Sequence, residues 1–245
     1  MLLLIVLLAL QSAQPVALKR FEVVRIDPPA MERLPSSLRA MFADPAPGAE
    51  PVASQDEAAA RAGFTPRLPK STNKPEFGII DSVNGETVIK TAELNMALDN
   101  AKASDVSVPK EWDGVVIKIQ QAPGILADYG GFLIMQAPPL MLTVPPGFAL
   151  DRLMETILRI IGIDAKDASA LREKFAVNAA AFFPIGSRYD MDIHEVRLNS
   201  GPGILLQNAD KVGEIAFAWS SADRSYFITG QLTEAQVIEI ANSMQ

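Results

Sequence analysis

Short strand-like segments joined by turn residues fill much of the chain after Phe77 and constrain its fold more than any other feature. β-Branched and aromatic residues, which favour extended structure, dominate these segments. Ser200–Gly203 and Ser221–Arg224 each separate two of them, and Asn84-Gly85, the dipeptide most typical of a two-residue hairpin, separates another two. Strands that are joined by such short turns pair antiparallel, so the sequence predicts an antiparallel sheet.

Helical spacing of apolar residues predicts several helices beside this sheet. Residues 149–162 carry a wide stripe of leucine, isoleucine and methionine, and residues 166–175 form a second helix after a turn. In the C-terminal helix, Thr233 and Gln236 have the spacing of a capping box. The apolar face of that helix consists of Val237, Ile240, Ala241 and Met244. The predicted fold class is therefore α+β, an antiparallel sheet with helices packed on one face, preceded by an apolar membrane or signal segment.

Composition divides the chain into four parts. Residues 1–17 are an apolar membrane-anchor or signal segment, and residues 18–44 are predicted to form a strand and a short helix. Residues 45–53 are rich in proline and alanine, which is typical of a stiff linker. We expect an extracytoplasmic α+β domain over residues 54–245, which opens with a helix between a Ser54 cap and Gly63.

The N-terminal segment has several interpretations that the sequence leaves open. Residues 1–10 carry no charge, but a helix rises about 1.5 Å per residue, so this stretch covers only about half of a bilayer core. It is a short anchor, a signal peptide without its usual basic start, or the outer half of a longer membrane helix; an internal core helix is the fourth alternative. The first three place the rest of the chain outside the cytoplasm. We expect a membrane-anchored protein, with secretion after signal cleavage as the alternative.

Charge and cysteine content exclude several classes of function. The net charge is -7 and no long run of lysine or arginine occurs, so we expect no nucleic-acid partner. The absence of cysteine excludes disulfides, thiolate metal sites and a cysteine nucleophile. The nearest approach to a basic cluster is Arg61, Arg67, Lys70 and Lys74, which lies among prolines and is interpreted as a solvated loop.

Only one group of residues suggests metal or catalytic chemistry. Asp190, Asp192 and His194 alternate along a predicted strand and would share one face. Two carboxylates and an imidazole can bind a divalent cation, but no further ligand cluster completes the coordination. They are therefore weak metal candidates, and we expect no cofactor, no metal and no catalytic residue. A metal-dependent hydrolase built on these three residues is a remote alternative.

The sparse aromatic residues and the long apolar stripe are interpreted mainly as core. Trp219 ends an alternating strand and is predicted to be buried, whereas Trp112 is predicted to be partly exposed. The stripe between Leu150 and Ile161 would pack on a sheet. In an alternative function, an envelope carrier, the same stripe would help to enclose a lipid or a peptide.

Several segments occur in an order that is typical of one family. They are "AAARAGFTPRLP", "NGETVIKTAELNMALDNAKASDVSVPKEWDGVVIKI", "NSGPGILLQ", "IAFAW" and "YFITGQLTEAQVIEIANSM". Together they resemble the uncharacterised extracytoplasmic domain that follows the membrane helix in bacterial membrane-anchored anti-sigma factors. The resemblance covers Leu18–Gln245, and its most specific part is the series Trp219, Tyr226, Gly230 and Leu232 with the final helix.

The resemblance implies a non-enzymatic sensory or regulatory domain that acts in signal transduction and transcription regulation. In such proteins a cytoplasmic His/Cys zinc-binding segment holds the sigma factor, and one membrane helix links it to the outer domain. This sequence contains no such segment, so a sigma factor is expected as a partner only if a cytoplasmic segment lies upstream of Met1. The remaining expected partners are the membrane, through the N-terminal segment, and a protein or hydrophobic ligand outside the cytoplasm.

Overall fold

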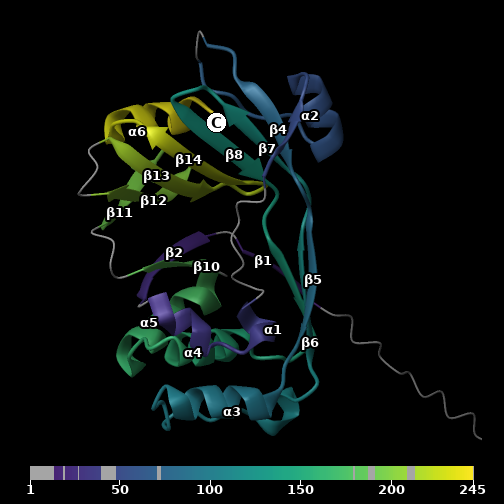
Figure 1. Ribbon diagram of the computed structural model, residues 1–245, viewed down its shortest axis with the longest axis vertical. Coiled ribbons are helices and arrows are strands. Elements are labelled where there is room, and N and C mark those ends of the chain that lie inside the picture. Colours follow the sequence, from purple (N-terminus) through teal and green to yellow (C-terminus); the bar gives the residue numbers. More distant parts are fainter. Residues whose placement is uncertain are drawn as a thin grey trace, which may run out of the picture.

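Two lobes stacked along the longest axis make up the molecule (Figure 1). The computed structural model describes residues 14–18, 20–26, 28–39, 48–70, 73–178, 180–186, 191–208 and 213–244. The upper lobe holds a large antiparallel sheet, and the lower lobe holds two smaller sheets with helices beneath them. The α+β class is confirmed.

The sheet of the upper lobe has eight strands in the order β11-β12-β13-β14-β8-β7-β4-β3. They are β3 (Glu50–Val52), β4 (Glu76–Ile80), β7 (Gly124–Asp128), β8 (Phe132–Ala137), β11 (Met191–Leu198), β12 (Gly201–Asn208), β13 (Glu214–Ser220) and β14 (Ser225–Gln231). Helix α2 (Gln55–Ala62) packs over Ile125, and α6 (Glu234–Ser243) packs in the cluster that contains Ala127. Ile125 and Ala127 are two residues apart on β7, so both helices cover the same face of this sheet, while the other helices labelled in Figure 1 lie in the lower lobe.

The lower lobe contains a four-stranded antiparallel sheet in the order β1-β9-β6-β5 and a parallel pair of β2 and β10. The strands are β1 (Gln14–Ala17), β2 (Arg20–Ile26), β5 (Val83–Val88), β6 (Val116–Gln121), β9 (Met141–Val144) and β10 (Ala180–Gly186). The helices are α1 (Ser36–Arg39), α3 (Thr91–Asn100), α4 (Leu150–Ile160) and α5 (Ala165–Asn178), with 3-10 turns η1 (Pro28–Arg33) and η3 (Lys110–Trp112). The parallel pair departs from the wholly antiparallel arrangement that the short turns predicted.

Three strands cross from one lobe to the other without changing their register. Ile80 pairs with Gly124 in the upper lobe and Val83 pairs with Gln121 in the lower lobe, a step of three residues on each strand. Likewise, the pairs Ile125–Gln136 and Gln120–Met141 are separated by five residues on each strand. Residues 76–88, 116–128 and 132–144 are therefore three long strands, which we call the ribbon.

All three strands of the ribbon are interrupted at the same level, which we call the waist. The interruptions are residues 81–82, 122–123 and 138–140, and the last two contain Pro123, Pro138 and Pro139. Proline has no amide hydrogen and cannot donate to a strand partner, so pairing stops there. The side-chain amide of Gln121 donates to the carbonyl of Pro138 (2.9 Å) and ties two strands together across the gap.

The hairpin predicted at Asn84-Gly85 is wrong. Both residues lie inside β5, where they pair with Gln120 and Ile119 of β6. The expected hairpin turn requires positive φ at both central residues, and neither residue has it. The correct partner strand comes only after α3, so long-range pairing overrides the local turn signal.

Each lobe has its own apolar core. Ile117 on the ribbon packs with Leu153, Ile157 and Ile160 of α4 in the lower core. In the upper core, Val237 of α6 belongs to one cluster with the following sheet residues: Ile134, Leu205, Phe217 and Ile228. The stripe of residues 150–161 is thus used in packing, as predicted. Trp219 is buried as expected, but Trp112, predicted to be partly exposed, is 4% exposed, and its ring lies tilted against that of Phe148 with centroids 5.2 Å apart.

Local signals at helix ends are confirmed. Ser54 accepts a hydrogen bond from the amide of Glu57, and Gly63 ends α2 in the left-handed conformation. Thr233 and Gln236 form the predicted capping box at the start of α6. Val237, Ala241 and Met244 on this helix are buried and Ile240 is partly buried, so α6 closes the upper core.

The part of the chain before residue 54 contributes to both lobes. Residues 1–13, and with them most of the predicted anchor, lie outside the described residues, but Gln14–Ala17 form β1 at the edge of the lower sheet. Val24, Ile26 and Leu38 belong to the lower core, and Glu50–Val52, assigned to the linker, form β3. The folded body therefore begins earlier than predicted. Within the described ranges, no helix is long and apolar enough to cross a bilayer.

Replacing Gly230 by alanine is expected to destabilise the upper lobe. Gly230 has a φ of +148°, and a Cβ there would lie 2.5 Å from the carbonyl oxygen of Gly131 and from the Cα of Phe132. The clash and the unfavourable backbone should lower the free energy of unfolding by about 2 to 4 kcal/mol, measured by urea denaturation. Gly85→Ala, where a Cβ meets nothing within 4 Å, is the control and should change it by less than about 0.5 kcal/mol. Equal effects of the two substitutions would contradict the strand pairing described here.

Candidate functional site

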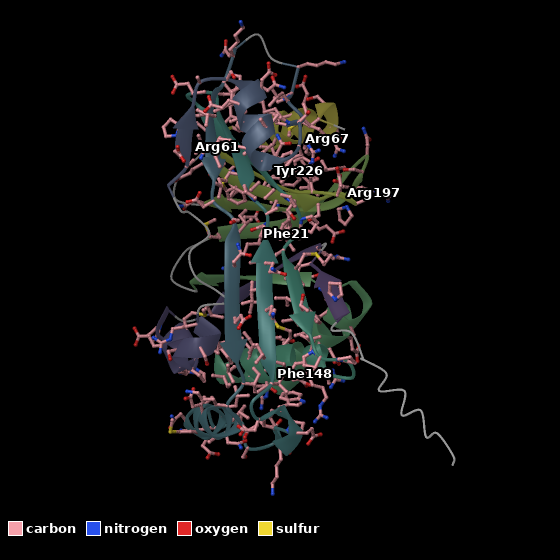
Figure 2. The ribbon with its side chains drawn as sticks, turned by 90° about the vertical axis from the view of Figure 1, so that its right-hand side faces the viewer. Phe21, Arg61, Arg67, Phe148, Arg197 and Tyr226 are labelled. Atoms are coloured by element: carbon pink, nitrogen blue, oxygen red, sulfur yellow. The ribbon has the colours of Figure 1, made fainter. Side chains whose placement is uncertain are left out.

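A polar cluster joins the segment after α2 to the covered face of the large sheet. The chain leaves α2 at Gly63, and Arg67 then lies over β8 and β14, where it contacts Gln136 and Tyr226. Gln136 and Tyr226 are partners in the strand register, so their side chains emerge side by side. Figure 2 shows Arg67 and Tyr226 together in the upper lobe. We call Arg67, Gln136, Asp223 and Tyr226 the Arg67 cluster.

Gln136 fixes the backbone of Arg67. Its side-chain oxygen accepts a hydrogen bond from the Arg67 amide (3.0 Å), and its side-chain nitrogen donates to the Arg67 carbonyl (2.7 Å). The residue is 1% exposed. A buried primary amide needs both a donor and an acceptor, and the backbone of Arg67 supplies both. The Gln136 side chain thus pairs with the backbone of this segment as a neighbouring strand would.

The guanidinium of Arg67 is held by a carboxylate and a phenol. It donates to both oxygens of Asp223, at 3.3 and 3.1 Å, and to the hydroxyl of Tyr226. The ring of Tyr226 stacks on that of Trp219 with centroids 4.6 Å apart. The ring of Trp219 in turn stacks on that of Phe217 with centroids 5.3 Å apart. Stacking among Phe217, Trp219 and Tyr226 fixes the position of the Tyr226 hydroxyl. The two hydrogen bonds to Asp223 fix the orientation of the Arg67 guanidinium.

Charge in the cluster favours the ionised form of both partners. Burial alone would lower the pKa of Arg67, but the hydrogen bond from its guanidinium to Tyr226 and the charge of Asp223 raise it overall. The hydrogen bond from Ser221 and the charges of Arg67 and Arg224 lower the pKa of Asp223. Because the guanidinium already has protein partners, the cluster fastens the segment to the sheet and does not offer a free cation to an anionic ligand.

The other cations of the predicted basic loop are dispersed. Arg61 pairs with Glu50 of β3, and this hydrogen bond and charge lower the pKa of Glu50. Lys70 and Lys74 are exposed. Arg224 donates to the carbonyl of Thr65 (2.8 Å) and so adds a second tie between the loop and the β13–β14 turn.

The predicted metal candidates are only partly described. Asp190 lies outside the described residues. Asp192 and His194 share a face of β11, with Nδ1 of His194 3.5 Å from a carboxylate oxygen of Asp192. Nε2 of His194 lies 3.5 Å from a carboxylate oxygen of Glu234, the first residue of α6, which sequence reasoning did not connect to this strand. Among the described residues, no three histidine, cysteine or acidic side chains are arranged to hold a metal ion.

One buried carboxylate was missed by sequence reasoning. Glu22 on β2 is 7% exposed and lies 3.1 Å from the ammonium of Lys174 on α5 and 3.2 Å from the guanidinium of Arg20. Its burial follows from alternation, because Glu22 shares a strand face with Val24 and Ile26 of the lower core. Glu22 forms an ion pair with each of these cations, and the pair with Lys174 joins β2 to α5.

Comparison with known proteins gives no match: no family model, no curated protein and no solved structure is similar to this chain. Ser200 lies in the two-residue turn between β11 and β12 and not at the strand-to-helix elbow that a nucleophilic serine of a hydrolase would occupy.

Substituting Gln136 by leucine should release the Arg67 segment. The change leaves two partly buried backbone groups of Arg67 without partners, so the free energy of unfolding should fall by about 2 kcal/mol. Trypsin should also cleave the native protein faster after Arg67. Gln120→Leu, on the exposed face of β6, is the matched control and should be nearly neutral. Unchanged stability and cleavage in Gln136→Leu would show that the cluster does not hold this segment.

We predict that the protein has no divalent-metal requirement. His194→Gln keeps a polar side chain at this half-buried position and should leave the melting temperature and the metal content unchanged. The measurement is elemental analysis and thermal unfolding of protein purified without added metal. Stoichiometric zinc or manganese that is lost in His194→Gln would overturn the prediction.

Proposed function

We propose that this protein is a non-enzymatic extracytoplasmic sensory or regulatory domain, held at a membrane by its N-terminal segment. It would be of the kind found in bacterial membrane-anchored anti-sigma factors. The observation that carries the proposal is that four of the five sequence segments on which the resemblance depends meet in the upper lobe, while the fifth, residues 84–119, forms β5, α3, η3 and β6 of the lower lobe.

Segments far apart in the sequence form one face of the upper lobe. "AAARAGFTPRLP" supplies α2 and the Arg67 segment, and "YFITGQLTEAQVIEIANSM" supplies β14 and α6. Arg67 and Tyr226 join the two segments directly, and Trp219 of "IAFAW" stacks on Tyr226. Segments that pack against one another support membership of one domain type more strongly than separate short similarities do. The contacts among these segments therefore favour the resemblance to the anti-sigma-factor domain.

The well-formed polar clusters hold the fold together, which favours a regulatory role over catalysis. The Arg67 cluster ties a loop to a sheet, and Glu22 ties β2 to α5 through Lys174. In each case the charged group faces an opposite charge of the same chain. Such pairs stabilise one conformation, whereas a catalytic site needs groups that point toward a substrate.

The lower lobe is the point of attachment in this proposal. Gln14 begins β1 at the edge of the lower sheet, so an N-terminal segment in a membrane would place the lower lobe next to the bilayer. The upper lobe, with the face formed by α2 and α6, would then point away from the membrane. That arrangement suits a domain that senses or binds outside the cytoplasm.

Deleting residues 2–10 tests the anchor while sparing β1. The full chain should sediment with membranes and resist extraction by high salt, because each buried leucine-sized side chain contributes roughly 1.5 to 3 kcal/mol. The shortened chain should be soluble with an unchanged melting temperature. Protease added to intact spheroplasts should digest the full chain, which reports an outward-facing domain.

Two outcomes would contradict the anchor. One is a full chain that is soluble and retains residues 1–10. The other is a soluble chain that has lost its N-terminus, which would support the secreted alternative. A control that replaces the exposed Val88, which is not part of the N-terminal segment, by serine should not change the fraction in which the protein is found.

A further inference from the structure

We propose that the two lobes open and close about the waist of the ribbon, and that two contacts from β2 to β11 latch the closed form. The inference concerns a conformational device of this fold and does not depend on the proposed function. It rests on three independent features: separate cores, aligned strand interruptions and an interface between the lobes in which several apolar side chains are only partly buried.

The first feature is that neither core crosses the waist. Ile117, Ile119 and Leu142 on the ribbon belong to the lower core, whereas Ile125 and Ile134 belong to clusters of the upper lobe. Most apolar burial therefore occurs within a lobe. A change in the angle between the lobes would leave both cores intact, and this is the condition for a rigid-body motion.

The second feature is the alignment of the interruptions in the ribbon. All three strands lose their pairing at residues 81–82, 122–123 and 138–140, while the register on both sides is unchanged. A continuous sheet resists bending because hydrogen bonds would break in every strand. Here the strand pairing between the three strands of the ribbon is already absent at one level, where the Gln121 side chain donates to Pro138 and the Leu18 amide donates to the carbonyl of Leu140 (2.9 Å). A few backbone torsions can therefore absorb a change of angle.

The third feature is the contact between the large sheet and β2, which packs against β12 and β13 from below. On the face covered by α6, Leu205 and Phe217 are fully buried. On the opposite face of the large sheet, Leu206 and Phe227 are only partly buried. Phe21 and Val23 of β2 are also only partly buried. They lie on the face of β2 that is opposite the buried Glu22 and Val24. Side chains that remain partly exposed bury less apolar surface than those in the interior of either lobe, so each contributes less stability.

Two polar contacts hold the lobes together at one edge. Arg20 of β2 forms an ion pair with Glu195 of β11 (3.0 Å), and Arg25 of β2 donates to the carbonyl of Met191. Both are exposed, and an exposed ion pair shifts an equilibrium by only about two- to fivefold. The latch is therefore weak enough to be released by a ligand or a partner that prefers the open form.

The absence of cysteine makes the motion directly measurable by pulsed electron resonance between two spin labels. Glu239 on α6 and Glu173 on α5 are exposed and lie in different lobes, so Glu239→Cys with Glu173→Cys reports the distance between lobes. Glu239→Cys with Glu76→Cys reports distances within the upper lobe. Glu173→Cys with Met96→Cys does so within the lower lobe.

Removing the two contacts between β2 and β11 should lengthen the distance between the lobes and leave the distances within each lobe unchanged. In Glu195→Gln combined with Arg25→Gln, we expect a longer-distance population that exceeds the wild-type one by about two- to fivefold for each contact removed. Lys118→Gln is the matched control, because it breaks an exposed ion pair with Glu86 inside one sheet, and it should change no distance. The distances within each lobe should be the same in every variant.

Two results would overturn the proposal. One is a distribution between the lobes that is identical in the wild type and the double latch variant. The other is a change in the distances within a lobe, since the proposal treats each lobe as a rigid body. Because the pairs within each lobe also report that it is folded, an unfolded variant cannot be mistaken for an open one.

Discussion

The unchanged register of the ribbon is the constraint on which the rest of the structure depends. Side chains alternate along a strand, so a slip of one residue on either side of the waist would turn the core-facing side chains outward. The alternation is kept: Ile117 and Ile119 below the waist and Ile125 and Ala127 above it are all odd-numbered and all buried. One strand can therefore supply both cores. Strand β14 then adds to the ribbon in the upper lobe and β1 adds to it in the lower lobe.

The ribbon also explains which parts of the fold could be predicted from the sequence. Helix caps depend on residues a few positions apart, and the capping box of α6 and the Ser54 cap were found for this reason. The hairpins around residues 199–200 and 221–224 depend on turn residues beside their strands. The Asn84-Gly85 prediction failed because β5 finds its partner 28 residues or more along the chain, as in the Val88–Val116 pair, and no local signal carries that information.

The same distinction between local signals and long-range contacts applies to the candidate site. Asp192 and His194 were placed on one face by strand alternation, but the contact with Glu234 requires α6 to lie beside β11. Arg67 was recognised only as part of a basic loop. Its partners Gln136, Asp223 and Tyr226 come from two other parts of the chain, and only the sheet register brings them together. Gln136 in a strand of apolar residues was the one local sign, because a buried amide needs partners.

Cross-strand nuclear Overhauser contacts in the folded protein test the register of the ribbon most directly. In an antiparallel pair, backbone protons of opposed residues approach closely enough to be detected. The account predicts contacts between Asn84 and Gln120 and between Glu86 and Lys118 below the waist, together with contacts between Ile79 and Ile125 above it. Contacts between Ser82 and Thr87 and between Ile80 and Ile89 would instead report a hairpin at Asn84-Gly85 and would contradict the continuous ribbon.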